Sequence, residues 1–150
     1  MTHGLDTGFL VAAEVAEHPA HAGTRSQLAH LLAAGDRLAL APQVLAEFVH
    51  VVTDPKRFTR PLEMSDALRL AQQWWTAREV DQVFPNDAAM RQFLDWMQRH
   101  RLGRKRLLDT LLAATYRSAG ADSLLTLNSA DFAIFGGFTF IAPKPANAAS

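Results

Sequence analysis

Helical segments alternate with short apolar runs along this chain, and the alternation is plainest near its end. Leucines and alanines dominate residues 106–120, a helical segment that closes at Gly120, a residue type that commonly ends helices. Residues 124–127 then form an apolar run with the length of a short buried strand. A chain built from such units is expected to fold as an α/β domain with a short, mainly parallel central sheet.

The same alternation continues through the rest of the chain. Helical composition or spacing marks residues 9–17, 24–34, 43–52, 65–77 and 86–100. Apolar runs predict strands at residues 37–40, 80–84 and 138–141. Residues 1–5 are too short and mixed to interpret alone, although Asp6 follows them as it would follow a strand. Adjacent Trp74 and Trp75 cannot both be buried by one helix face, so we expect them in the core or at an interface.

The composition fits a single domain with a sizeable core, because 49% of the 150 residues are hydrophobic. We expect this domain to span residues 1–142 and residues 143–150, which include two prolines, to form a flexible tail. Fifteen basic and fifteen acidic residues give a formal net charge of zero. Affinity for a polyanion must therefore come from local basic patches.

The chain contains no cysteine, which excludes a disulfide framework and thiolate metal sites and is compatible with a reducing cytoplasm. Its first residues lack the basic and apolar regions of a signal peptide. No apolar run approaches the roughly 20 residues that a membrane span needs. We therefore expect a soluble, cytoplasmic protein without a membrane partner.

Asp109 is an acid in apolar surroundings. Leu112, Ala113 and Tyr116 follow it by three, four and seven positions, so they share its helix face. An aspartate in the first turn of a helix is also favoured by the positive helix end, and this explains Asp109 about as well as a site does. The two interpretations are compatible, because the helix end would keep the carboxylate charged for a cation.

Glu47 and Asp6 each have a structural and a functional interpretation. Glu47 lies well inside its helix at the edge of the apolar face, where it is either an ordinary boundary residue or reaches into a cleft. Asp6 follows a candidate strand and could cap the next helix. Residues 6–8 spell Asp-Thr-Gly, as in aspartic proteases, but those proteins are all-β and this chain is rich in helices.

Asn128 and Asp131 follow the last strand of the opening unit. Their spacing of three suits a helix cap and its partner in a turn, about as well as it suits a site role for Asp131. Ligand sites in parallel sheets form beyond the carboxyl ends of the strands. The same end of the sheet is therefore expected to hold Asp6 and the 128–131 turn.

Taken together, Asp6, Glu47, Asp109 and Asp131 suit one metal site. Carboxylates brought close together repel each other and raise one another's pKa, and a bound divalent cation removes that repulsion. A ligand set of oxygens, without Cys or a paired-His motif, favours Mg²⁺ or Mn²⁺ over Zn²⁺.

In four segments the chain resembles the PIN domain, especially the VapC-type ribonuclease toxins of bacterial toxin–antitoxin pairs. The segments are residues 5–10, 44–48, 108–115 and 125–132. The resemblance implies a three-layer α/β/α sandwich in which Asp6, Glu47 and Asp109 are catalytic metal ligands. It implies Asp131 as the fourth acid, with Asn128 and Thr7 as accessory residues.

The resemblance also implies an endoribonuclease that depends on Mg²⁺ or Mn²⁺, forms a homodimer and is held inactive by a cognate antitoxin. Its chemistry would be attack on an RNA phosphodiester by metal-activated water. Two basic clusters beside the acids could hold the RNA backbone, although solvated loops explain each residue taken singly. They are Lys56, Arg57 and Arg60 after the Glu47 helix, and Arg101, Arg104, Lys105 and Arg106 before Asp109.

Two other functions remain alternatives at this point. A non-catalytic PIN-like module would bind RNA or protein without cutting, although the presence of all four acids argues against it. A phosphatase-type enzyme would use Asp6 as a nucleophile. The glycine at position 8, where such an enzyme needs a second aspartate, weakens that alternative.

Overall fold

A five-stranded sheet forms the centre of the computed structural model, which describes residues 1–141. Its strands are β1 (Thr2–Leu5), β2 (Arg37–Leu40), β3 (Val80–Gln82), β4 (Ser123–Leu125) and β5 (Thr139–Phe140). The order is β3-β2-β1-β4-β5, and every neighbouring pair is parallel. The predicted parallel α/β sheet is confirmed, and residues 1–5, which could not be interpreted alone, supply its central strand.

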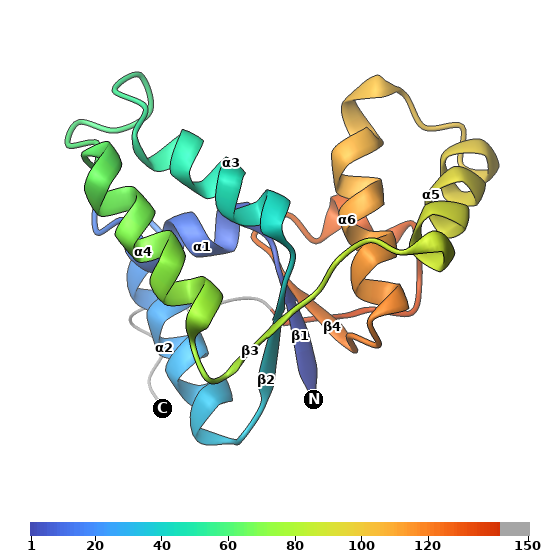
Figure 1. Ribbon diagram of the computed structural model, residues 1–150, viewed down its shortest axis with the longest axis horizontal. Helices are drawn as coiled ribbons and strands as arrows, with labels where there is room; N and C mark the ends of the chain where they lie inside the picture. Colours follow the sequence, from blue (N-terminus) through green and yellow to red (C-terminus); the bar gives the residue numbers. More distant parts are fainter. Residues whose placement is uncertain (142–150) are drawn as a thin grey trace.

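Helices cover both faces of this sheet, which confirms the three-layer sandwich (Figure 1). On one face lie α1 (Thr7–Glu14), α2 (His21–Ala33), α3 (Pro42–Val52) and α4 (Met64–Thr76). On the other lie α5 (Asp87–Arg99) and α6 (Leu107–Ser118), with the short helices η1 (Arg104–Arg106) and α7 (Ala130–Ala133) before and after α6. No helix within residues 1–141 is long and apolar enough to cross a membrane. The tail expected at residues 143–150 lies outside the described residues.

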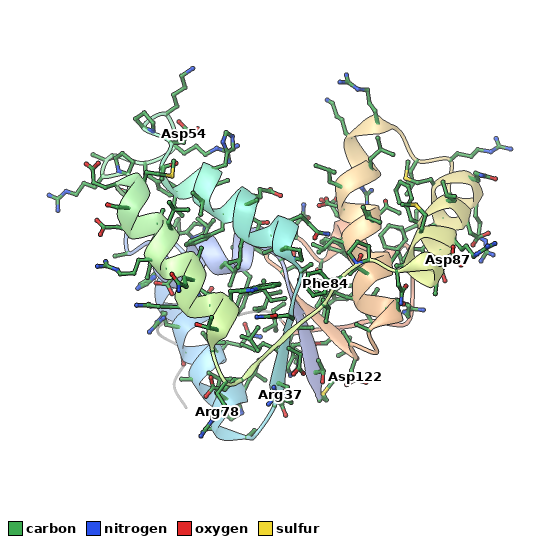
Figure 2. All side chains as sticks on the ribbon, viewed as in Figure 1. Arg37, Asp54, Arg78, Phe84, Asp87 and Asp122 are labelled. Carbon is green, nitrogen blue, oxygen red and sulfur yellow. The ribbon has the colours of Figure 1, made fainter. Side chains whose placement is uncertain are left out.

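Within residues 1–141, the chain changes sides of the sheet once. The elements from β1 to β3 build one side, and an extended segment that carries Phe84 then leads to α5, α6 and β4 (Figures 1 and 2). Strands β1 and β4 are neighbours in the sheet. The helix that follows β1 lies on one side of the sheet, and the helices that precede β4 lie on the other. Such a switch point leaves a crevice outside the carboxyl ends of the strands, where ligands bind in α/β sheets.

Several boundaries differ from the sequence prediction for local reasons. Helix α1 begins at Thr7 rather than at residue 9, because the Asp6 side chain caps it. It ends at Glu14 rather than at residue 17, because the backbone of Val15 is extended. Asn86 caps α5 as expected, accepting a hydrogen bond from the Ala89 amide at 2.8 Å.

Tyr116 ties α6 to the central strands. Its side chain is fully buried, and its hydroxyl donates to the carbonyl oxygen of Leu5 and accepts from the amide of Ala41 at 3.3 Å. The ring lies directly on Gly4, where an added Cβ would be only 2.5 Å from a ring carbon. Glycine at position 4 is therefore required by close packing.

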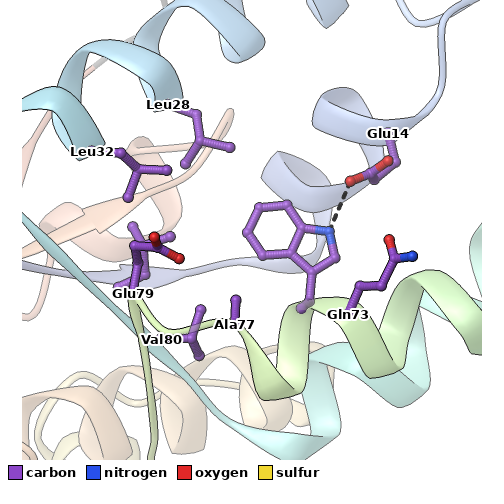
Figure 3. Close-up of a pocket in the computed structure, with 9 residues that line it drawn as sticks. Glu14, Leu28, Leu32, Gln73, Ala77, Glu79 and Val80 are labelled. Atoms are coloured by element: carbon purple, nitrogen blue, oxygen red, sulfur yellow. Dashed lines mark hydrogen bonds between the residues drawn. The ribbon is translucent and has the colours of Figure 1, made fainter.

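The two adjacent tryptophans are divided between the core and its edge. Trp74 is buried, and its indole Nε1 donates to a carboxylate oxygen of Glu14 at 2.9 Å, as Figure 3 shows. Trp75 is half-buried and packs edge-on against Phe84, with ring centroids 5.8 Å apart. The prediction of a core role is confirmed for Trp74.

A buried histidine joins the amino ends of the strands, opposite the crevice. His3 in β1 is fully buried and hydrogen-bonds through Nδ1 to the hydroxyl of Ser123 in β4. Its Nε2 lies 2.7 Å from a carboxylate oxygen of Asp36, just before β2. Backbone pairing and this side-chain link together connect the central strand to the elements on both of its sides.

Candidate active site

Asp6 lies at the carboxyl end of the central strand, where the chain leaves β1 for α1. One carboxylate oxygen accepts from the Thr7 amide at 2.7 Å, and the other accepts from the Thr126 hydroxyl at 2.7 Å. The residue also lines the cleft described below. The same side chain thus caps α1 and lines the cleft, so the capping and site interpretations of the sequence are compatible.

Thr126 contacts the candidate site residue Asp6, and the sequence analysis did not single it out. Its hydroxyl donates to Asp6 and accepts from the amide of Asn128 at 3.0 Å, so it links β1 to the turn that follows β4. The prediction placed it inside a strand of residues 124–127, whereas β4 ends at Leu125. A polar residue within that apolar run was the available signal.

Three of the four predicted acids line one cleft of about 800 Å³. Asp6 comes from the end of β1, Glu47 from the middle of α3 and Asp109 from the first turn of α6. Most of the residues that line this cleft come from α3 and α6 and from the carboxyl end of β1. Helices α3 and α6 belong to opposite outer layers (Figure 1). Arg104 and Lys105 complete one rim.

The acids influence one another electrostatically. Burial raises the pKa of the Asp6 carboxyl, and the charges of Glu47 and Asp131 raise it further, against the hydrogen bonds from Thr126 and Thr7. Burial also raises the pKa of Asp109, and the charges of Asp6 and Asp131 add to this effect. A nearby cation would relieve this repulsion.

The donor chemistry of the cleft fits a hard divalent cation, although the side chains are not gathered around one point. Among residues 1–141, no three His, Asp or Glu side chains are arranged to hold one metal ion. Within the same residues, the carboxylates of Glu47 and Asp109 have no hydrogen-bond or ion-pair partner, so their oxygens are free to turn toward an ion. Carboxylate oxygens are the ligands that Mg²⁺ and Mn²⁺ prefer.

Asp131 approaches the other acids from α7, but the predicted cap does not form. Ser129 rather than Asn128 occupies the position before α7, and its side chain makes no capping bond. The Asn128 side-chain amide instead donates to the Asp131 carboxylate. The capping-box interpretation is therefore wrong, because the two side chains pair with each other and leave the helix start uncapped.

The basic residues fall into two kinds. Arg104 and Lys105 are exposed at the cleft, and Lys56 and Arg57 are exposed in the connection between α3 and α4. Arg106 differs, because it is half-buried and its guanidinium donates to the backbone carbonyl of Asp131. Its positive charge also opposes the rise in the pKa of Asp109, so it favours the charged form of that carboxylate.

Comparison with known proteins gives a consistent result. The family model described as "PIN domain" matches residues 5–135. Over 132 residues the chain is 30% identical to ribonuclease VapC24 of Mycobacterium tuberculosis, which covers 88% of this chain and 90% of that protein. The same match is found in two strains of that organism.

Solved structures share the fold at lower sequence identity. VapC20 of Mycobacterium tuberculosis, described as a sarcin–ricin loop cleaving toxin, superposes with a TM-score of 0.70 at 18% identity, covering 95% of this chain and all of that one. VapBC-1 of nontypeable Haemophilus influenzae gives 0.64 at 17% identity, covering 94% and 97% of the two chains. VapBC2 of Rickettsia felis, bound to a promoter DNA fragment, gives 0.63 at 19%, covering 94% and 98%.

Proposed function

This chain belongs to the PIN domain family, and on that premise we propose that it is a metal-dependent endoribonuclease and the toxin of a toxin–antitoxin pair. The observation that carries the proposal is the cleft that Asp6, Glu47 and Asp109 line together, with Asp131 close enough to raise the pKa of Asp6 and of Asp109. The name ribonuclease, carried by the relative that is 30% identical, supports RNA as the substrate.

Asp6, Glu47, Asp109 and Asp131 would hold one or more Mg²⁺ or Mn²⁺ ions. A cation bound there lowers the pKa of water and stabilises charge on the phosphate under attack. Thr126 and the Thr7 amide fix the orientation of the Asp6 carboxylate. Arg106 holds the backbone at Asp131 against the start of α6, so that the fourth acid keeps its place.

RNA would lie across the cleft with its backbone on the exposed basic residues. Arg104 and Lys105 stand at the rim next to Asp109, and Lys56 and Arg57 stand beyond the end of α3. Because the net charge of the chain is zero, these local clusters must supply the attraction for phosphate.

The partners follow from the same family relationship. The VapBC complexes among the similar structures support a cognate antitoxin, which would restrain the enzyme in the cytoplasm.

We further infer a homodimer. Large apolar side chains are exposed on α5 and α6, including Leu94 at 49% and Leu108 at 76%, and they offer apolar surface for such a contact. Sedimentation of the purified protein tests this inference.

The test of the activity is cleavage of RNA in Mg²⁺ or Mn²⁺. We expect cleavage to stop with EDTA and in the Asp6→Asn and Asp109→Asn variants, because each change removes the metal or a ligand. Asp87→Asn is a matched control, since Asp87 is exposed and, among residues 1–141, its carboxylate pairs with Arg91 alone, on the surface of α5. Cleavage that persists without metal in Asp6→Asn or Asp109→Asn would refute the metal-dependent mechanism.

Calorimetric titration with Mn²⁺ separates the enzyme from a non-catalytic binding module. The enzyme is expected to bind Mn²⁺ and to lose that binding in Asp109→Asn. A module that binds RNA without binding Mn²⁺ at these acids would favour the alternative.

A further inference from the structure

A second pocket, of about 420 Å³, lies on the other side of Glu47 from the main cleft. Thr7 and Glu47 line both hollows, so the pocket and the cleft adjoin at these two residues. The pocket is built by α1 and α3 together with the connections that follow them. Exposed Gly8, Glu47 and Arg57 border it, which leaves it open to solvent next to the acids.

Part of the lining of this pocket is apolar and includes an aromatic ring. Val11 is buried, and Val51 and Phe58 are half-buried. Splayed bases of single-stranded RNA are bound by such walls, where aromatic side chains stack on the base and neighbouring polar groups bond to its edge.

The polar groups of the pocket include two hydrogen-bond donors, His18 and Arg57. The Nδ1 atom of His18 accepts from the amide of Ala20 at 3.0 Å, so in the neutral ring the proton is on Nε2. Burial lowers the pKa of His18, and the neighbouring charge of His21 lowers it further, which favours that neutral form near pH 7. The guanidinium of Arg57 carries donors only.

We propose that this pocket binds one nucleobase of the RNA strand, beside the phosphate that is cut at the acids. The proposal rests on the nuclease function proposed above and adds a source of sequence preference to it. Two donor side chains in one lining favour a base edge that carries two neighbouring acceptors. Guanine presents O6 and N7 and cytosine presents O2 and N3, and the experiment distinguishes them.

The test uses a pool of single-stranded RNA with a randomised window, cut in Mn²⁺ and sequenced at the new ends. Wild type is expected to favour one base class at a fixed position next to the cut. His18→Ala should reduce that preference about tenfold, because one hydrogen bond to the base is lost. Gly8→Leu should also reduce the preference, because a leucine side chain at position 8 would fill part of the pocket. The backbone tolerates it, since no atom lies within 4 Å of an added Cβ. His30→Ala, an exposed histidine on α2, is the matched control.

Each variant is also measured for thermal unfolding and for Mn²⁺ affinity, so that misfolding or damage to the acids is recognised. Reduced preference with unchanged Mn²⁺ affinity supports the pocket as a base site. Two results overturn it while leaving the nuclease intact: metal-dependent cleavage by wild type without base preference, or full preference retained in both His18→Ala and Gly8→Leu. Failure of wild type to bind Mn²⁺ and cut any RNA would overturn both proposals.

Discussion

Replacing Tyr116 with phenylalanine removes one hydroxyl group from the centre of the protein. In the wild type this hydroxyl bonds to the Leu5 carbonyl, at the end of β1, and to the Ala41 amide, just before α3. Both backbone groups belong to buried residues, so no water replaces the lost partner. Burial also raises the pKa of Tyr116, so the hydroxyl remains a donor throughout the neutral range.

The magnitude follows from the two groups that lose their partner. A buried donor or acceptor left unpaired costs about 1–3 kcal/mol. Taking the lower part of that range, about 1–2 kcal/mol for each of the two groups, we expect a loss of about 2–4 kcal/mol in the free energy of unfolding. For a domain of this size, that loss corresponds to a fall in Tm of roughly 5–15 °C.

The assay is urea unfolding followed by tryptophan fluorescence, with the slope of the transition compared between proteins. Ser118→Ala serves as the control, because it also removes a hydroxyl but from an exposed side chain that bonds to Asn86. That control should change stability by less than about 0.5 kcal/mol. If Tyr116→Phe matched the wild type within the same margin at an equal slope, the reasoning about unpaired backbone groups would be refuted.

Three further perturbations test the packing and the charges. Gly4→Ala should destabilise by about 1–3 kcal/mol, since its Cβ would overlap the Tyr116 ring, and Tm reports the loss. In EDTA, stability should fall as pH rises from the ordinary value of 3.8 through the raised pKa of Asp6, because the folded state holds that proton longer; Asp6→Asn should lack this component. The hydrogen bond from His3 lowers the pKa of Asp36, so its stabilisation is present above 3.8 and lost as pH falls through the lowered pKa; Asp36→Asn should lack that loss.

Differences between each variant and the wild type isolate these effects from the other carboxylates, which titrate in both proteins. A Tm of Gly4→Ala equal to that of the wild type would contradict the close packing. Parallel profiles of Tm against pH for Asp6→Asn and the wild type in EDTA would contradict the raised pKa of Asp6. Parallel profiles for Asp36→Asn and the wild type would contradict the lowered pKa of Asp36.

Local patterns in the sequence were sufficient for most of the fold. The strand at residues 37–40 was predicted with the bounds that the structure has, because an apolar run there is closed by Gly35 before it and Pro42 after it. The placement of Asp6 and the 128–131 turn at one end of the sheet could be anticipated, because parallel strands carry their carboxyl ends to one edge. Glu47 and Asp109 were assigned to the same site because the four acids together suit one metal site.

What the sequence could not supply depends on contacts between distant residues. Thr126 reaches Asp6 only because β4 pairs with β1 in a particular register, which no local pattern encodes. Arg106 belongs to a basic run, yet its burial against Asp131 follows from the packing of α7 on α6. The pocket beyond Glu47 combines two connections far apart in the chain, so its walls share no motif.

The single crossing of the chain from one side of the sheet to the other divides the four acids equally. Residues 1–82 contain Asp6 and Glu47, and residues 87–141 contain Asp109 and Asp131. A chain cut between these parts would give two fragments, each with half of the proposed ligand set. The pairing between β1 and β4 would have to re-form before the four acids could hold a metal ion together. We expect each fragment alone to be inactive and nuclease activity to require that the two fragments associate.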